Sequence, residues 1–452
     1  MVKHKKLSMA VAGAFALCGA SAAHAFNVKA GDWDLSMSGE VNAFYSYTHC
    51  DNNANLIAGG VTCTTSNENQ FSSIESGLLP SALVFSAKTT QEGFDIGVTF
   101  GFYPGINNGG QVSGANIGTG NNSALGSTGI DMRQNFLTFG DKEMGTIKMG
   151  RDLGIFGSDA ILSDMTLLGV GTNQSPSAPG NTTLGRIGVG YIYADWIPQI
   201  IYISPSSEGF QVSAGIFQPL DMIGGSGGAP GTVGTAGFAG TTTTASGHEL
   251  PMVQAKATWD YDIGDVKGRA WVGGLAQRSM VNDALDGSGL NNRGITAYAG
   301  DVGIKGNVYG FEPVIYYYQG RGVGTTGLFL NGIDSSGNKR NSRGGYVQVA
   351  RSFGKWRPSF SYGLSQLSTS AGESSASNPS LVKTNRSRVQ MLQYQLTKSL
   401  TLVEEFTTTH SKSQQHGATA CTATDTAGLC TATGTTGTNM QYNISLGAIL
   451  FF

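Results

Sequence analysis

Apolar and polar residues alternate along most of this chain with a period of two. The last thirteen residues, 440–452, show it most clearly. Asn443, Ser445 and Gly447 are polar or small, and they separate residues that are apolar or aromatic: Tyr442, Ile444, Leu446, Ala448, Leu450 and Phe452. Successive side chains of a strand point to opposite faces, so this strand has one face suited to lipid and one suited to water.

The same alternation recurs in short segments and predicts sixteen strands, joined alternately by seven short turns and eight long loops. Short turns on one side and long loops on the other are typical of a membrane-spanning β-barrel. An even number of strands places both chain ends on the same side of the membrane, and the first and last strands can then pair. Because predicted boundaries shift by a few residues, fourteen or eighteen strands are also possible. The strands cover 33–47, a segment ending near 90, 94–102, 130–140, 144–151, 196–204, 209–218, 250–262, 265–278, 294–307, 310–319, 343–353, 355–367, 385–396, 399–410 and 440–452.

Three short turns are followed by the same dipeptide, in Gly93-Phe94, Gly209-Phe210 and Gly310-Phe311. Aromatic residues at one end of many strands form the girdle that marks a membrane interface. We therefore expect these three phenylalanines at one rim of the barrel.

The first 25 residues resemble an export signal. Lys3, Lys5 and Lys6 precede an apolar run over 9–17, and Ala23-His24-Ala25 completes a small-residue cleavage site. This is the pattern of a secretory signal peptide, 1–25, removed before Phe26. The mature protein is then 26–452.

Composition supports a barrel rather than helices. The whole chain has 28 Lys and Arg against 30 Asp and Glu, and loss of the signal leaves 25 against 30, which excludes a nucleic-acid binder by charge. No run of eighteen apolar residues remains to span a membrane as a helix. An exported membrane chain of this kind satisfies its backbone in a closed barrel. We predict an all-β, antiparallel transmembrane barrel in a Gram-negative outer membrane, with one domain where length alone suggests about three.

A sixteen-stranded barrel encloses an aqueous channel, whereas an eight-stranded one is filled by side chains. Such a wide lumen needs a structure that narrows it. The longest connection inside the first half, 152–195, is the third long loop and the candidate for this role.

Two adjacent strand motifs lead into that loop: Met132-Arg133-Gln134-Asn135-Phe136-Leu137 and Gly145-Thr146-Ile147-Lys148-Met149-Gly150-Arg151. With Asp164 in the loop and the terminal Phe452, they resemble the trimeric general porins of Gram-negative outer membranes. The resemblance implies homotrimers, a third loop folded into the lumen, and a barrel-assembly machinery that reads Phe452.

In that family, cations on the wall face acids on the infolded loop. The resemblance therefore implies that Arg133 faces Asp164, and it makes further constriction residues of Arg151, Asp159, Arg186 and Glu40. Asp195 is the alternative to Arg186 if the following strand begins later. Ala82 and Glu40 stand where family members can carry wall cations, and Leu168 lacks the second acid of some members. The charge preference therefore does not carry over.

Simpler interpretations of these residues remain open. Arg133 and Arg151 are then ordinary interior charges of a wide barrel. Asp159 and Asp164 are then caps of loop turns, where aspartate is common because it hydrogen-bonds to its own backbone. Three further cations, Lys267, Arg269 and Arg357, alternate with apolar neighbours and are predicted to line the lumen wall.

Four cysteines remain in the mature chain, all in the first and last long loops. An oxidising compartment favours disulfides, and four cysteines allow three pairings. The local pairs Cys50–Cys63 and Cys421–Cys430 close short loops. Pairing across the two loops is the alternative, since these loops can be neighbours in a closed barrel.

The sequence gives little sign of catalysis. His49, His248, His410 and His416 lie near loops, and no Gly-x-Ser-x-Gly elbow stands between a strand and a helix. We predict no enzyme activity, no metal and no cofactor.

The predicted function is passive diffusion of ions and small hydrophilic solutes through a water-filled channel. The alternatives are a substrate-selective porin with a binding site at the constriction, and a surface barrel used mainly in adhesion or recognition. The predicted partners are further copies of the chain, outer-membrane lipid and lipopolysaccharide, the assembly machinery and small solutes.

Overall fold

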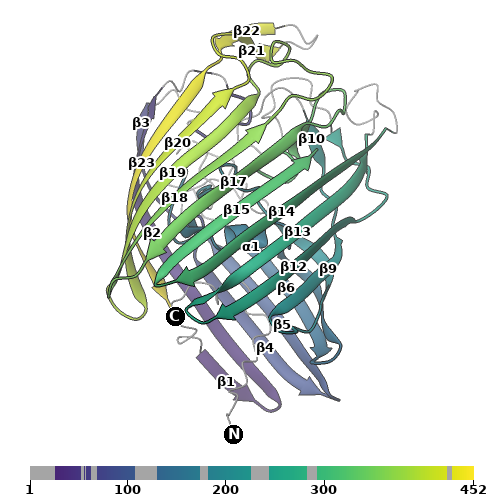
Figure 1. Ribbon diagram of the computed structural model, residues 1–452, viewed down its shortest axis with the longest axis vertical. Helices are drawn as coiled ribbons and strands as arrows, with labels where there is room; N and C mark the ends of the chain where they lie inside the picture. Colours follow the sequence, from purple (N-terminus) through teal and green to yellow (C-terminus); the bar gives the residue numbers. More distant parts are fainter. Residues whose placement is uncertain are drawn as a thin grey trace.

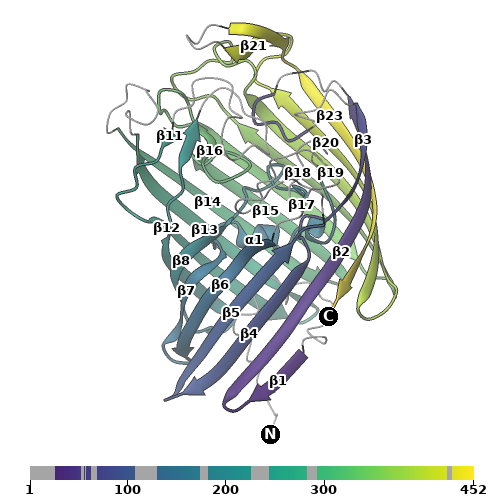
Figure 2. The same cartoon turned by 180° about the vertical axis from the view of Figure 1, so that it is seen from behind.

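The computed structural model describes residues 26–51, 55, 57–62, 69–106, 130–173, 182–224, 244–281, 293–424 and 430–452, without the side chains of 420–433. These residues form a closed antiparallel β-barrel (Figures 1 and 2). The predicted signal peptide lies outside the described residues and stays a prediction.

Sixteen strands build the wall, each paired with the next, and the last pairs with the first. The predicted fold class and strand number are therefore confirmed. In chain order they are β2 (Trp33–Asp51), β4 (Ala82–Gln91), β5 (Phe94–Pro104), β6 (Ile130–Asp141), β7 (Gly145–Leu153), β8 (Trp196–Ile203), β9 (Phe210–Phe217), β12 (Met252–Ile263), β13 (Val266–Met280), β14 (Gly294–Val308), β15 (Phe311–Arg321), β17 (Asn341–Arg351), β18 (Trp356–Leu367), β19 (Val382–Gln395), β20 (Leu400–Ser413) and β23 (Thr438–Phe451).

Two short strands that the alternating pattern did not predict pair with the parts of β2 that the neighbouring long strands leave unpaired. β3 (Gln70–Glu75) pairs with its upper half, in line with β4 on the lower half. β1 (Phe26–Ala30) pairs with residues 33–37, just below the end of β23. Phe452 exchanges two backbone hydrogen bonds with Gly39, of 2.8 and 3.0 Å. The seam between the first and last strands therefore leaves little unpaired backbone.

Other short strands lie in the long loops. β10 (Met222–Gly224), β11 (Thr244–Ala245) and β16 (Leu330–Ile333) form a small sheet. β21 (Thr419–Thr424) and β22 (Cys430–Thr435) form a hairpin at the end of the barrel opposite both chain termini (Figure 1).

Three of the short turns have the geometry that twisted hairpins need. Glu92-Gly93, Glu208-Gly209 and Tyr309-Gly310 all have positive φ, at 51 and 87°, 50 and 85°, and 51 and 82°. Positive φ at both central positions defines a type I′ turn, which explains the glycine in each second position. The phenylalanine that follows is exposed in all three, as a girdle at this rim requires.

The two faces of β23 differ as its sequence predicts. Ile444, Leu446 and Leu450 are 49%, 53% and 44% exposed on the outside. Asn443 and Ser445 are fully buried on the inside, where Ser445 Oγ lies 2.8 Å from Ser46 Oγ. Neither helix of the described residues, α1 (Ser158–Ile161) or the 3-10 helix η1 (Met165–Leu168), is long and apolar enough to cross a membrane.

Leu446 tests the assignment of the outer face. Leu446→Arg should destabilise the barrel by roughly 2–4 kcal/mol, because it places a cation in the apolar band. The control Leu446→Phe keeps an apolar residue there and should be nearly neutral. Denaturant unfolding of protein refolded into lipid vesicles measures both, and equal stability of the two variants would contradict a lipid-facing Leu446.

Candidate functional site

The third loop runs through the inside of the barrel, where α1 is visible between the walls (Figures 1 and 2). It leaves β7 at Leu153 and returns at Trp196. The loop backbone is bound by the opposite wall: Tyr346 Oη donates to the carbonyl of Ala160 at 2.7 Å, and Gln348 accepts from Met165 N at 2.7 Å. The loop is therefore fixed to β17 rather than suspended in the lumen.

Asp159, on α1, meets the cations of the next strands. One carboxylate oxygen lies 2.5 Å from Lys256 Nζ, and the other lies 3.5 Å from Arg269 Nη1. Lys305 faces the lumen directly opposite Arg269 in the register of β13 and β14. Burial alone would raise the pKa of Asp159, but Lys256 and Arg269 hold this pKa below its usual value. Asp159 therefore stays ionised at neutral pH.

Further polar contacts complete this charged cluster. Arg269 forms a two-pronged pair with Asp260, with N–O distances of 2.6 and 2.7 Å. Asp301 accepts the backbone N–H of Gly157 at 3.1 Å and the hydroxyl of Tyr316 at 3.2 Å. The tip of the loop is thus held against β12, β13 and β14 by the two ion pairs of Asp159 and the hydrogen bond from Gly157 to Asp301.

A second acid of the loop, Asp164, is buried in a clamp. Its carboxylate caps η1 through Thr166 N at 3.0 Å, accepts from Tyr191 Oη at 2.9 Å and lies 3.7 Å from Arg186 Nε. Arg186 also donates to Ser387 Oγ at 3.0 Å, and both charged side chains are fully buried. Burial lowers the pKa of Arg186, and the charge of Asp164 opposes this shift.

The later part of the third loop is hydrogen-bonded to β20 and β23, beside the seam where β23 pairs with β2. Glu405 on β20 accepts the backbone N–H groups of Val170 and Gly171, at 3.1 and 2.6 Å. Gln441 on β23 donates to the carbonyl of Asn173 at 3.0 Å. The loop therefore reaches from β12 to β23 across the interior.

Arg133 points inward because β6 bulges at this position. Gly101 pairs with Gln134 and Phe102 with Met132, so Arg133 is the extra residue of a β-bulge, and both Arg133 and Gln134 are buried inside. Bulges re-aim side chains in this way. The guanidinium lies 3.3 Å from Asp131 and 5.2 Å from the centre of the Tyr103 ring.

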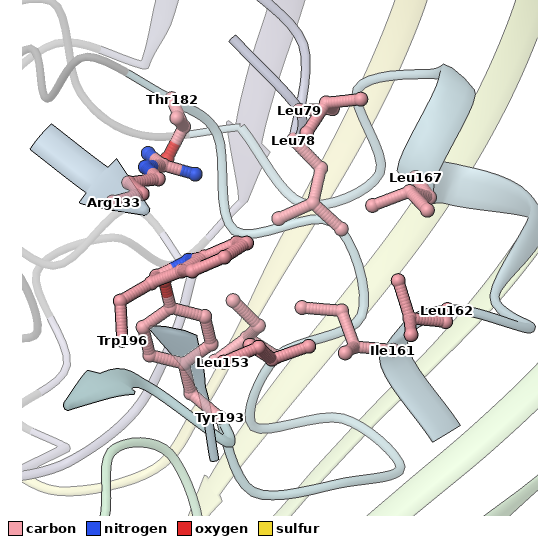
Figure 3. A pocket seen from close by; sticks show the side chains of 11 residues that line it. Leu78, Leu79, Arg133, Leu153, Ile161, Leu162, Leu167, Thr182, Tyr193 and Trp196 are labelled. Carbon is pink, nitrogen blue, oxygen red and sulfur yellow. The ribbon is translucent and has the colours of Figure 1, made fainter. Parts of the chain in front are cut away.

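A small cavity adjoins Arg133 (Figure 3). The indole of Trp196 lies between the guanidinium and a cluster of leucine and isoleucine side chains from the third loop and its neighbours. The cavity volume is about 40 Å³. Since one water needs roughly 10–15 Å³, it has room for a few waters and not for a nutrient-sized solute.

The expectation that Arg133 and Asp164 face each other across the lumen stays a prediction, and their ion-pair partners are other residues. Arg133 pairs with Asp131, and Asp164 pairs with Arg186 instead. The two motifs place these residues in the third-loop region, but they do not show which partner each one reaches. The acid that meets wall cations is Asp159, and the alternative role of Asp164 as a turn cap is also seen.

Other predicted residues lie in different places. Arg151 pairs in register with Asn135 and Pro198, which are exposed, so its Cα–Cβ bond points to the outer face of β7. Glu40 is buried inside and accepts from Asn42 Nδ2 at 2.9 Å. Near the short turns, Lys267 pairs with Asp262 at 2.8 Å, and Arg357 pairs with Glu312 at 2.6 Å.

Sequence reasoning missed Lys256, Lys305 and Asp260. All three alternate with apolar residues in predicted strands, as in Lys256-Ala257-Thr258-Trp259-Asp260. The period-two rule that found Arg269 would have found them as well. The pattern does not give the register between strands, and this register places the charged residues of β12, β13 and β14 side by side.

Of the predicted cysteines, Cys50 is buried at the end of β2. Cys63 and the side chains of Cys421 and Cys430 lie outside the described part of the structure. The pairing stays a prediction.

Comparison with known proteins places the fold. No protein-family model matches the chain. No curated protein matches it either. Among solved structures, the outer membrane channel DcaP of Acinetobacter baumannii is similar, with a TM-score of 0.59 and 15% identity over 94% of this chain and 99% of that one. Salmonella typhi OmpF, solved in complex with daunomycin, has a TM-score of 0.53 and 12% identity over 94% of this chain and 100% of that one. The chain thus has the porin-like barrel fold of outer-membrane channels.

The clamp should hold the loop in place. Arg186→Met leaves the buried Asp164 carboxylate without its cation, and we expect a loss of about 3–5 kcal/mol in the stability of the docked loop. The double variant Arg186→Met/Asp164→Leu removes both charges and should recover part of that loss. Limited proteolysis of the third loop in the folded barrel measures the effect. Equal protection of wild type and Arg186→Met would contradict the clamp.

Proposed function

We propose that the protein is a porin, a channel for passive diffusion of ions and small hydrophilic solutes across the outer membrane. The supporting observation is the third loop, which crosses the lumen and sets Asp159 against Lys256 and Arg269. A sixteen-stranded barrel without such a loop would be wide and unselective. The proposal includes no catalysis and no cofactor.

In this proposal, the channel selects solutes by its width at the third loop and by the fixed charges there. Opposed charges in a narrow throat create a field across it, which orders water and disfavours apolar solutes. Acids and cations are interleaved in the cluster, with Asp159, Asp260 and Asp301 beside Lys256, Arg269 and Lys305. A nearly balanced cluster favours weak ion selectivity over a strong preference for one sign.

Two single variants test this throat. Asp159→Asn should raise relative anion permeability, and Lys256→Met should raise relative cation permeability, because each removes one fixed charge. The reversal potential of a planar bilayer under a salt gradient measures both, at low salt where screening is weak. Lys142→Gln, on a turn at the rim, is the control. Reversal potentials unchanged in both throat variants would exclude Asp159 and Lys256 as determinants of selectivity.

A substrate-selective porin is the second candidate, and the cavity beside Arg133 favours it. This cavity has an apolar wall beside the Arg133–Asp131 ion pair, which suits a small amphipathic solute. At its present size a solute would enter only if the loop moved. Channel current that saturates or blocks with one solute would support this candidate over general diffusion.

We also propose that the chain assembles as a homotrimer, that the assembly machinery reads Phe452, and that the cysteines form local disulfides. Peptide mapping of unreduced protein should recover Cys50–Cys63 and Cys421–Cys430. A peptide that joins the first loop to the last would contradict local pairing.

A further inference from the structure

The mouth of the barrel on the side of the long loops is filled by packed side chains. On β13, the inward residues near the short turn, Lys267 and Arg269, are exposed and half-buried. Further along the same face, Leu275, Gln277 and Ser279 are 5%, 1% and 0% exposed. The inward positions of β14 and β20 at this end are buried as well. A water-filled mouth would leave these side chains exposed, so this mouth is closed in the structure.

One segment of a long loop belongs to the packed mouth. Residues 322–333 follow β15 and include β16, and we call them the mouth loop. Figure 2 shows β16 near the end of the barrel opposite both chain termini. Val323, Phe329 and Ile333 are 0% exposed. They belong to one apolar cluster that also includes Met222 of β10 and inward side chains of β13 and β14. An apolar constriction excludes water and ions, so this cluster can close a pore.

The mouth loop is joined to two neighbours by backbone hydrogen bonds. Tyr193 N, in the returning limb of the third loop, donates to the carbonyl of Thr326 at 2.8 Å. Ile223 N, on β10, donates to the carbonyl of Phe329 at 3.2 Å, and β10 pairs with β16. A displacement of the mouth loop therefore also frees the returning limb of the third loop from one of its backbone contacts.

The two ends of the mouth loop meet at Arg340. The carbonyl of Arg340 accepts Gly322 N at 2.9 Å, and Arg340 N donates to the carbonyl of Gly332 at 2.8 Å. The guanidinium of Arg340 is in turn paired with Glu373 at 2.5 Å. A compact loop with its ends held together in this way can lift as a unit while its base stays fixed.

The mouth loop is strained in its closed position. Six non-glycine residues in the described part of the chain have positive φ, and three of them begin type I′ turns. The other three are Asp195, Phe329 and Asn331, at 59, 66 and 56°. Positive φ is unfavourable for a side chain as bulky as phenylalanine, and such strain collects in segments that switch between conformations. Two of these residues lie in the mouth loop, and Asp195 lies two residues after its partner Tyr193.

We propose that the mouth loop is a gate, which closes the channel in the position described and opens it by lifting from the apolar cluster. This inference rests on the proposed porin function. The buried apolar side chains hold the gate closed, and the strain at Phe329 and Asn331 opposes them. The channel therefore alternates between a closed and a conducting state, and its width at the third loop acts only in the conducting state.

A disulfide between the mouth loop and β10 tests the gate. Ile223 and Leu330 are paired neighbours on β10 and β16. Strands that pair lie about 4.8 Å apart, within the Cα separation that a disulfide spans. Leu220, just before β10, exchanges hydrogen bonds of 2.9 and 2.6 Å with the side chain of Gln277 on the wall, so β10 is a fixed anchor.

The double variant Ile223→Cys/Leu330→Cys should lock the gate under oxidising conditions. Its conductance in a planar bilayer should fall roughly tenfold or more on oxidation and return on reduction, because the apolar cluster then stays in the pore. The single variant Ile223→Cys is the control, since it keeps the native cysteines and cannot form the new bond. Peptide mapping verifies the bond, and heat-modifiable migration on gels verifies the folded barrel.

Two substitutions test the gate without a cross-link. Phe329→Ser removes a buried ring from the cluster and should raise the open fraction of single channels roughly tenfold. Asn331→Gly removes the strain of a positive φ and should lower the open fraction about fivefold. Tyr309→Gly is the matched control, because it relieves the same kind of strain in a short turn and should leave the open fraction unchanged.

The outcomes separate the gate from the proposed function. Equal conductance of the oxidised and reduced double variant, with the bond verified, would overturn the gate. Open fractions unchanged in both Phe329→Ser and Asn331→Gly would overturn it as well. Folded barrels that conduct in no variant and in neither redox state would overturn the porin function, and the gate with it.

Discussion

The structure depends on one constraint: backbone groups inside a membrane have no water to bind, so the strands must close on themselves. β23 therefore pairs with β2 along residues 40–51, and Phe452 exchanges two hydrogen bonds with Gly39. β1 covers the part of β2 that lies below this end. Once the sheet is closed, the outer face meets lipid and the inner face encloses a wide lumen. The third loop and the charged residues of the inner face are arranged within that lumen.

The third loop crosses the lumen under the same constraint. A chain segment inside the barrel still has backbone groups to satisfy, and inward side chains supply the partners. Gln348, Glu405 and Gln441 bind loop backbone, while Tyr346 and Asp301 hold α1. Ion pairs of Asp159 and Asp164 add charge to this network. The same contacts that hold the loop therefore set the electrostatics of the passage beside it.

Charged side chains are treated differently on the two faces of the wall. Inside, cations such as Lys256 and Arg269 are balanced by carboxylates, because a confined space makes an unpaired charge costly. Outside, Arg386 and Arg388 are exposed, and no ion pair among the described residues includes either of them.

The sequence by itself determined the strands, their faces and the barrel, because a period of two is a local property that each segment carries alone. It also located the third loop, and it indicated that Asp159, Asp164 and Arg269 belong near the lumen. Only the tertiary structure decided which charges meet. Arg133 pairs with Asp131 because of a bulge in β6, Asp164 pairs with Arg186, and Arg151 lies on the outer face. Register, bulges and the path of the loop bring together residues that are 97 positions apart, as in Asp159 and Lys256, and no local pattern records such contacts.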